Sequence, residues 1–122
     1  LVDDNDLGLI AKRPIANGVW RANENPDVHS APTNYAEEYF RRAGVMTRLG
    51  DIIDEPEDRI MTSMGYIFSF NEIDVGIIGT QNPKHLINNI NMYSKCLEMS
   101  ENVVDELNKR FDELGKDWDQ RT

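Results

Sequence analysis

The stretch Val75-Gly-Ile-Ile-Gly-Thr-Gln-Asn-Pro83 decides the fold. Its first five residues are apolar and rich in branched side chains, which is typical of a short parallel strand buried on both faces. Asn82 and Pro83 then predict the start of a helix, with Asn as the N-cap and Pro as the first helical residue. A strand that turns through Gly79 directly into a capped helix indicates an α/β protein.

The same kind of pattern extends outward from this stretch. Leu7–Lys12, which ends at Arg13-Pro14, predicts a second buried strand. Apolar residues at helical spacing predict helices over Asn34–Leu49, over Pro56–Phe70, from Asn82 onward, and from Ser100 to just before Gly115. The side chains expected on the buried stripes are Tyr35, Tyr39, Ala43, Met46 and Leu49; then Ile60, Met64, Ile67 and Phe68; then Leu86, Ile90, Tyr93 and Leu97; and last Val103, Val104, Leu107, Phe111 and Leu114.

Two strands and about four helices cannot close a sheet by themselves. Each strand lacks polar alternation, so we expect its edges to be covered by further sequence or by a partner chain. The chain begins with Leu1 rather than Met, which favours a piece of a longer protein. We therefore expect one fragment over 1–122: a strand and long loop over 1–33, helices over 34–74, a strand with two helices over 75–115, and a polar, frayed tail over 116–122.

Composition excludes several classes of function. Hydrophobic residues make up 39% and charged residues 29% of the 122 residues, a globular profile. The formal net charge of −9 disfavours binding to nucleic acid and to anionic membranes. The single cysteine, Cys96, allows no internal disulfide and no cysteine-based metal site, and we expect it to be a buried structural thiol. With no apolar run of membrane-spanning length and no basic leader, we expect a cytoplasmic protein.

Two turns could form ligand-binding sites. At Gly79–Pro83, the free N–H groups and the positive dipole end of the following helix could hold a phosphate, although an ordinary capped turn has the same pattern. At Arg13–Gly18, a strand again ends in small residues, where α/β folds place ligands, although a rigid turn is an equal alternative.

Both turns resemble segments of the aldo/keto reductases. Leu9–Trp20 is similar to the seventh strand and following loop of that family's (β/α)₈ barrel, and Val75–Asn89 is similar to the eighth strand and its helix. Tyr35–Arg42 and Met99-Ser-Glu also fall where the family has counterparts. The resemblance covers nearly the whole chain, and it implies that the α/β fold is a partial TIM barrel.

The resemblance implies a nicotinamide cofactor across the carboxyl ends of the strands. Thr80 and Asn89 match positions near the adenosine phosphate and the adenine, while His85, Asn88 and Gly79 depart from the family's usual arginine, glutamate and lysine. These departures leave NADP and NAD equally open, and Lys84 or Arg13 could compensate. The full set of expected cofactor-binding residues is Arg13, Ile15, Ala16, Asn17, Gly79, Thr80, Asn82, His85, Asn88 and Asn89.

No catalytic residue is expected in this chain, because the family's Asp, Tyr, Lys and His lie on its first four strands. Tyr35, Tyr39 and Tyr66 have core spacing, His29 lies in a polar loop, and Lys12 belongs to the seventh strand. We expect no metal site. Whether the chain counts as an enzyme is left open, because only the parent family is identified as an NAD(P)-dependent oxidoreductase acting on a small carbonyl or alcohol.

The expected function is therefore the cofactor-binding end of an aldo/keto reductase that is inactive alone and binds its cofactor weakly or not at all. The alternative is a standalone oligomerising or interaction module derived from the same barrel segment, without redox activity. A third alternative is a small nucleotide-binding domain that keeps the phosphate site. Whichever of these functions applies, we expect the isolated chain to associate with itself, because the edges of its strands are open.

Overall fold

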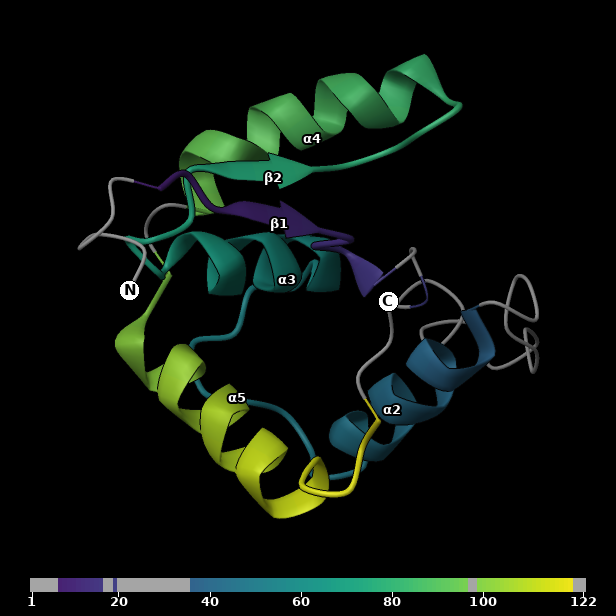
Figure 1. Ribbon diagram of the computed structural model, residues 1–122, viewed down its shortest axis with the longest axis vertical. Helices are drawn as coiled ribbons and strands as arrows, with labels where there is room; N and C mark the ends of the chain where they lie inside the picture. The colour runs from purple at the N-terminus through teal and green to yellow at the C-terminus, as the bar shows by residue number, and fades with distance from the viewer. Residues whose placement is uncertain (1–6, 17–18, 20–35, 97–98, 120–122) are drawn as a thin grey trace.

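The structure is a computed structural model that describes residues 7–16, 19, 36–96 and 99–119. Two short parallel strands and four helices make up an α/β arrangement in the described residues (Figure 1). The elements are β1 (Ile10–Lys12), α2 (Glu37–Thr47), α3 (Arg59–Phe68), β2 (Val75–Ile77), α4 (Pro83–Cys96) and α5 (Glu101–Leu114). This confirms the predicted order of elements, while each strand is shorter than its apolar run.

The two strands form one parallel pair. Ile10 lies opposite Val75 and Lys12 lies opposite Ile77. Just before the pair, the Asp74 carboxylate accepts a hydrogen bond from the Leu9 N–H at 2.7 Å, and the Asp74 N–H donates to the Leu9 carbonyl at 3.0 Å. Because the pairing is parallel, the carboxyl ends of both strands lie at the same edge.

Only one face of the strand pair is covered. Gly76 lies so close to α3 that a Cβ atom there would be 3.0 Å from the Phe68 ring, which explains a glycine within a strand. On the other face, Ile10, Val75 and Ile77 are 59%, 47% and 56% exposed. The apolar runs predict strands buried on both faces in a complete sheet. In this chain one face is bare, as expected when the helices alone cover two strands.

Helix α3 begins later than its sequence pattern predicts. Pro56 was expected in the first turn, but the cap is Asp58, whose carboxylate accepts from the Ile60 N–H at 2.8 Å. From there Ile60 and Met64 are buried against Ile78 and Met92, as the apolar stripe predicts. This small core joins α3 to the strands and to α4.

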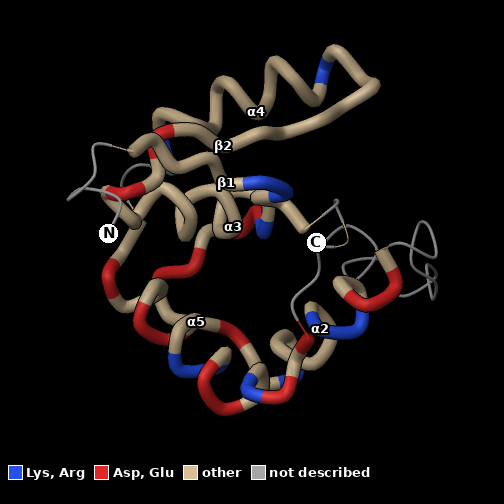
Figure 2. The backbone as a smooth tube through the Cα atoms, viewed as in Figure 1, with Lys and Arg blue, Asp and Glu red and all other residues tan. Residues whose placement is uncertain are grey.

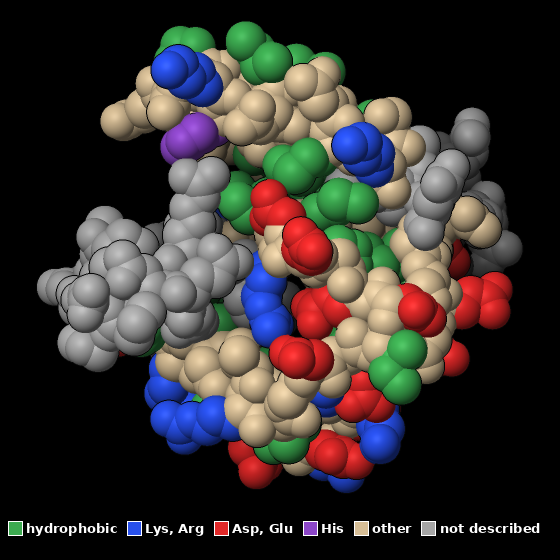
Figure 3. All heavy atoms as spheres, turned by 180° about the vertical axis from the view of Figure 1, so that it is seen from behind, with side chains coloured by type: hydrophobic (Ala, Val, Ile, Leu, Met, Phe, Trp, Pro, Cys, Tyr) green, Lys and Arg blue, Asp and Glu red, His purple; other side chains and the backbone are tan. Residues whose placement is uncertain are grey.

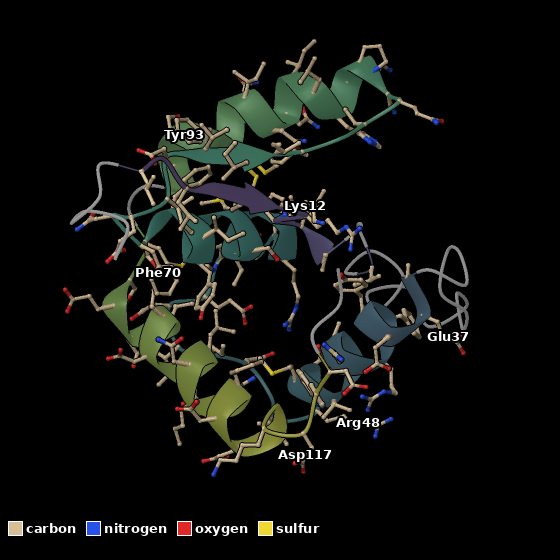
Figure 4. The ribbon with its side chains drawn as sticks, in the orientation of Figure 1. Lys12, Glu37, Arg48, Phe70, Tyr93 and Asp117 are labelled. Carbon is tan, nitrogen blue, oxygen red and sulfur yellow. The ribbon has the colours of Figure 1, made fainter. Side chains whose placement is uncertain are left out.

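Helix α4 begins where predicted but does not bury its predicted stripe. The Asn82 side chain accepts from the Lys84 N–H at 3.0 Å, so the capping prediction is confirmed. Leu86, Ile90 and Tyr93, however, are 52%, 64% and 45% exposed. Tyr93 does touch the Phe68 ring edge-on at 5.1 Å between centroids, and Figure 4 shows it at the far end of α4 from Pro83. Leu97 and the Cys96 side chain lie outside what the structure describes.

Helices α2 and α5 pack together away from the strands. Ala43 and Val103 are buried as predicted, whereas Leu49 and Phe111 are 48% and 52% exposed, so those two predictions are wrong. Helix α2 ends before Gly50, whose φ of 87° is the left-handed conformation that glycine adopts most readily. Tyr35 lies outside the described residues.

The first part of the tail is held against α2 rather than frayed. The Arg42 guanidinium lies 5.1 Å from the centroid of the Trp118 ring and donates to the Asp119 carbonyl at 2.8 Å. Trp118 also meets the Phe111 ring at 6.0 Å between centroids. The remaining tail residues, 120–122, are not described.

Charge is distributed unevenly over these elements. Acidic side chains gather on α5, on the start of α2 and on the connecting loops, whereas α4 carries no carboxylate (Figure 2). The view from behind shows hydrophobic side chains at the surface of the upper half and mixed charges over the lower half (Figure 3). Within the described ranges, no helix is both long enough and apolar enough to cross a membrane.

Candidate functional site

A cavity of about 520 Å³ lies at the carboxyl ends of β1 and β2. The strand ends supply its two sides, and the first turns of α4 close it. It brings together six of the predicted cofactor-binding residues. The full lining is Lys12, Arg13, Pro14, Ile15, Ile60, Ile77, Ile78, Gly79, Thr80, His85 and Asn89. The position agrees with the general placement of ligands at the carboxyl edge of parallel strands.

The charge of this cavity is opposite to that of the chain. Lys12, Arg13 and His85 line it, and no carboxylate does so among the described residues, although the whole chain carries a net charge of −9. Lys12 lies at the end of β1 (Figure 4). The Arg13 guanidinium donates to the Tyr39 hydroxyl at 3.1 Å, which fixes its position. Such a local cationic lining on an isoleucine floor suits an anionic ligand with an apolar part.

The turn into α4 differs from the predicted phosphate site in one respect. The N–H groups of its first residues were expected to be free, but Asn82 N–H donates to Thr80 Oγ1 at 3.2 Å and Lys84 N–H donates to the Asn82 side chain at 3.0 Å. The next two N–H groups, of His85 and Leu86, donate to the Asn82 carbonyl at 3.0 and 3.3 Å. The expectation of free helical N–H groups is therefore wrong, because Thr80 Oγ1, the Asn82 side chain and the Asn82 carbonyl already accept hydrogen bonds from them.

The turn after β1 has an uncommon backbone. Arg13 and Ala16 have φ angles of 62° and 47°, and the Ala16 N–H donates to the Arg13 carbonyl at 3.0 Å. This left-handed geometry points Ile15 toward the small core of α3 and α4 and places it in the cavity lining. Ala16, also expected to bind the cofactor, instead lines a different cavity, between α2, α3 and α5. Asn17 lies outside the described residues.

Two further predicted residues lie beside the main cavity rather than in its lining. Asn88 lines a smaller hollow of about 170 Å³ together with Asp58, His85 and Lys95. Asn82 acts as the helix cap described above. His85 and Asn89 contribute to both hollows, so the outer face of the first turns of α4 presents a continuous polar surface.

Sequence reasoning missed Lys12 and the apolar floor of the cavity. Lys12 was given no role because it is not the family's catalytic lysine, yet it lies in the lining with Ile60, Ile77 and Ile78. Its position as the last residue of β1 was the signal that could have found it, since ligands bind at strand carboxyl ends. His29 is not described. Among the described residues, no group of three His, Cys, Asp or Glu side chains could hold a metal ion.

Comparisons with protein-family models, with curated proteins and with solved structures found no match for this chain. The functional inference therefore depends on the residues of the cavity and on the sequence motifs that lead into it.

Proposed function

We propose that this chain is the nicotinamide-cofactor-binding part of an aldo/keto reductase, and that the cavity at the strand ends takes the adenosine-phosphate end of the cofactor. The observation that supports this is a lining that contains the cations Lys12 and Arg13, with His85 beside them and without a described carboxylate, in an acidic chain. A volume of about 520 Å³ lies within the ordinary range for ligand pockets, roughly 300–1,000 Å³.

Different lining residues would bind different chemical groups of the ligand. Lys12 and Arg13 would neutralise phosphate, and the Asn89 amide, which can donate and accept, would meet the adenine. Arg13 is better placed than Lys84 to hold a 2′-phosphate, because Arg13 lines the cavity and Lys84 does not. The binding of NADP would thus differ from the binding of NAD by the interaction of the 2′-phosphate with Arg13.

Within a complete enzyme, the nicotinamide cofactor would carry the hydride between itself and a carbonyl or alcohol. This chain would bind and orient the cofactor, while the proton donor and its partners come from other strands.

A titration calorimetry experiment with adenosine 2′,5′-bisphosphate tests the site. We expect Thr80→Ala and His85→Ala to weaken binding by about three- to tenfold each, since a hydrogen bond to a charged group is worth roughly 1.5 kcal/mol or somewhat less when exposed. Ser94→Ala, a hydroxyl on the distal part of α4, is the matched control and should leave the affinity unchanged. Unchanged binding in both site variants would contradict the assignment.

The 2′-phosphate can be tested separately. Adenosine 5′-monophosphate lacks it, so Arg13→Gln should weaken the bisphosphate more than the monophosphate if Arg13 holds that group. Equal losses for the two ligands would place Arg13 at the shared phosphate instead, and Arg13 would then not distinguish NADP from NAD.

Catalysis by the isolated chain is not expected. With NADPH and a panel of aldehydes, NADPH oxidation followed by absorbance should stay at the level of a protein-free control. Turnover that persists through repurification and is abolished by His85→Ala would contradict this proposal.

The second candidate is a self-associating module without redox activity. The exposed strand face favours it, since Ile10, Val75 and Ile77 are each about half exposed. The adenosine-bisphosphate titration separates the two candidates, because a module of this kind has no reason to bind the nucleotide.

A further inference from the structure

Arg13, which lines the cavity at the strand ends, is held by a residue that lies outside that cavity. Arg13 is half-buried just after β1, and its Nη1 group donates to the Tyr39 hydroxyl at 3.1 Å. Tyr39 belongs to α2, and none of the residues of this helix, all of which are described, lines the cavity. The orientation of one cation of the cavity therefore depends on a helix that contributes nothing to the lining.

The position of Tyr39 is itself fixed by packing. Its side chain lies against the buried cluster of Val19, Ala36 and Ala43. Because this packing restricts the ring, the hydroxyl is a fixed acceptor for the guanidinium rather than a mobile one.

The chemistry of the contact between Arg13 and Tyr39 suits an arginine that binds an anion. A hydroxyl carries no charge, so this hydrogen bond orients the guanidinium without neutralising it. The carboxylate next to Tyr39 in the sequence, that of Glu38, pairs with Arg41 and Arg42, both at 2.7 Å. An arginine that is already ordered loses less side-chain freedom when its planar fork meets a phosphate.

The other cation of the lining, Lys12, differs from Arg13 in both respects. Lys12 is exposed, and an ammonium acts as a point charge without a preferred plane. Arg13 is therefore the lining residue whose orientation can distinguish one phosphate position from another.

We propose that Tyr39 is a positioning residue for the phosphate by which NADP differs from NAD: its hydroxyl holds the Arg13 guanidinium where it pairs with the 2′-phosphate. This inference rests on the proposed nucleotide site. It adds to that site a specificity determinant on α2 that acts on the ligand only through Arg13.

Titration calorimetry of the full chain with adenosine 2′,5′-bisphosphate and with adenosine 5′-monophosphate tests the proposal. Tyr39→Phe keeps the ring and removes the acceptor, so we expect it to weaken binding of the bisphosphate about three- to fivefold, the effect of one side chain that must be ordered on binding. Binding of the monophosphate should stay nearly unchanged. In the Arg13→Gln background, Tyr39→Phe should have no further effect, because Tyr39 acts through Arg13.

Tyr66→Phe is the matched control. The Tyr66 hydroxyl is also on a half-buried ring and also joins two distant segments, since it donates to Asn108 Oδ1 at 2.6 Å, but Tyr66 does not line the cavity. Its removal should lower the unfolding temperature and leave both affinities unchanged. Tyr39→Met, which also lacks the acceptor, serves the same purpose as Tyr39→Phe if the phenylalanine variant does not fold.

The proposal is overturned if Tyr39→Phe leaves the bisphosphate affinity unchanged, weakens both ligands equally, or still weakens the bisphosphate in the Arg13→Gln background. If Arg13→Gln weakens the bisphosphate while Tyr39→Phe does not, the nucleotide site stands and only the role of Tyr39 is lost. If the original chain does not bind the bisphosphate, or if Thr80→Ala, His85→Ala and Arg13→Gln all leave its affinity unchanged, the nucleotide site itself is wrong, and the role of Tyr39 with it.

Discussion

Arg110 is the most deeply buried charged side chain among the described residues, at 4% exposure. Its guanidinium donates to the carbonyls of Met46, Gly50 and Asp51 at 3.3, 2.8 and 3.5 Å, and to the Glu106 carboxylate at 2.9 Å. One side chain of α5 therefore bonds both to the last turn of α2, at Met46, and to the loop that follows it, at Gly50 and Asp51.

Replacing Arg110 should destabilise the protein strongly. Arg110→Met keeps much of the length and apolar volume but leaves the carbonyls without a donor, so we expect the free energy of unfolding to fall by about 2–4 kcal/mol. Arg110→Lys should lose less, because an ammonium can still reach one of the carbonyls. Urea unfolding followed by circular dichroism measures both changes, and an Arg110→Met chain as stable as the original would contradict this role.

Glu38 gives the chain a defined response to acid. Its carboxylate pairs with Arg41 and Arg42, both at 2.7 Å, and hydrogen bonds from Arg41 and then Arg42 lower the pKa of Glu38 from 4.5 to about 2. A carboxyl with a lowered pKa stabilises the folded state above its unfolded pKa, and this contribution disappears as the pH falls from about 4.5 toward 2.

Glu38→Gln should therefore flatten part of the acid dependence. Between pH 5 and about 3, we expect the unfolding temperature of the variant to fall less steeply than that of the original chain, because the variant has no carboxylate to protonate. The effect should be small, since the pair is partly exposed and screened by salt. Glu37→Gln, at an exposed neighbouring carboxylate of the same helix turn, is the control (Figure 4). Parallel acid profiles for the original chain and Glu38→Gln would contradict the assignment.

At the scale of the element, the start of α3 depends on one capping residue. Asp58 accepts from the Ile60 N–H at 2.8 Å and precedes the two buried residues of the small core, Ile60 and Met64. Asp58→Ala should lower the free energy of unfolding by about 1 kcal/mol, whereas Asp58→Asn, which also caps well, should change it little. Thermal unfolding distinguishes the two, and equal losses in both variants would mean that charge rather than capping matters.

For α4, the predicted start is confirmed, whereas the prediction that its apolar face is buried is wrong. Its start depends on Asn82 and Pro83, which act within a few residues of one another. Its apolar residues have helical spacing whatever lies beside them. The pattern therefore predicts an apolar face but not that Leu86 and Ile90 on that face are more than half exposed.

At the scale of the whole molecule, the open strand face predicts self-association of the isolated chain. Burial of apolar surface contributes about 25 cal/mol per Å², so pairing two such faces is favourable. Analytical ultracentrifugation should show a concentration-dependent dimer or larger species, and the double variant Ile10→Thr, Val75→Thr should weaken it by removing apolar surface while keeping strand-forming residues.

Ile53→Thr is the matched control for that experiment. Ile53 is 77% exposed but lies in the loop between α2 and α3, away from the strands, so its replacement should leave association unchanged. A monomer at all concentrations, or equal weakening by the control, would contradict association through the strand face and would remove the observation behind the second candidate function.

The sequence by itself determined the order of strands and helices, the cap of α4, the glycine that ends α2, and the edge at which predicted ligand residues meet. These depend on backbone conformation and on hydrogen bonds over a few residues, which a local pattern records. Only the tertiary structure decided which apolar faces are covered, that the N–H groups of α4 are used by its own cap, and that Arg110 of α5 bonds to the last turn of α2 and to the loop after it. Such features depend on residues far apart in the chain, and their burial is set by what packs against them rather than by their own spacing.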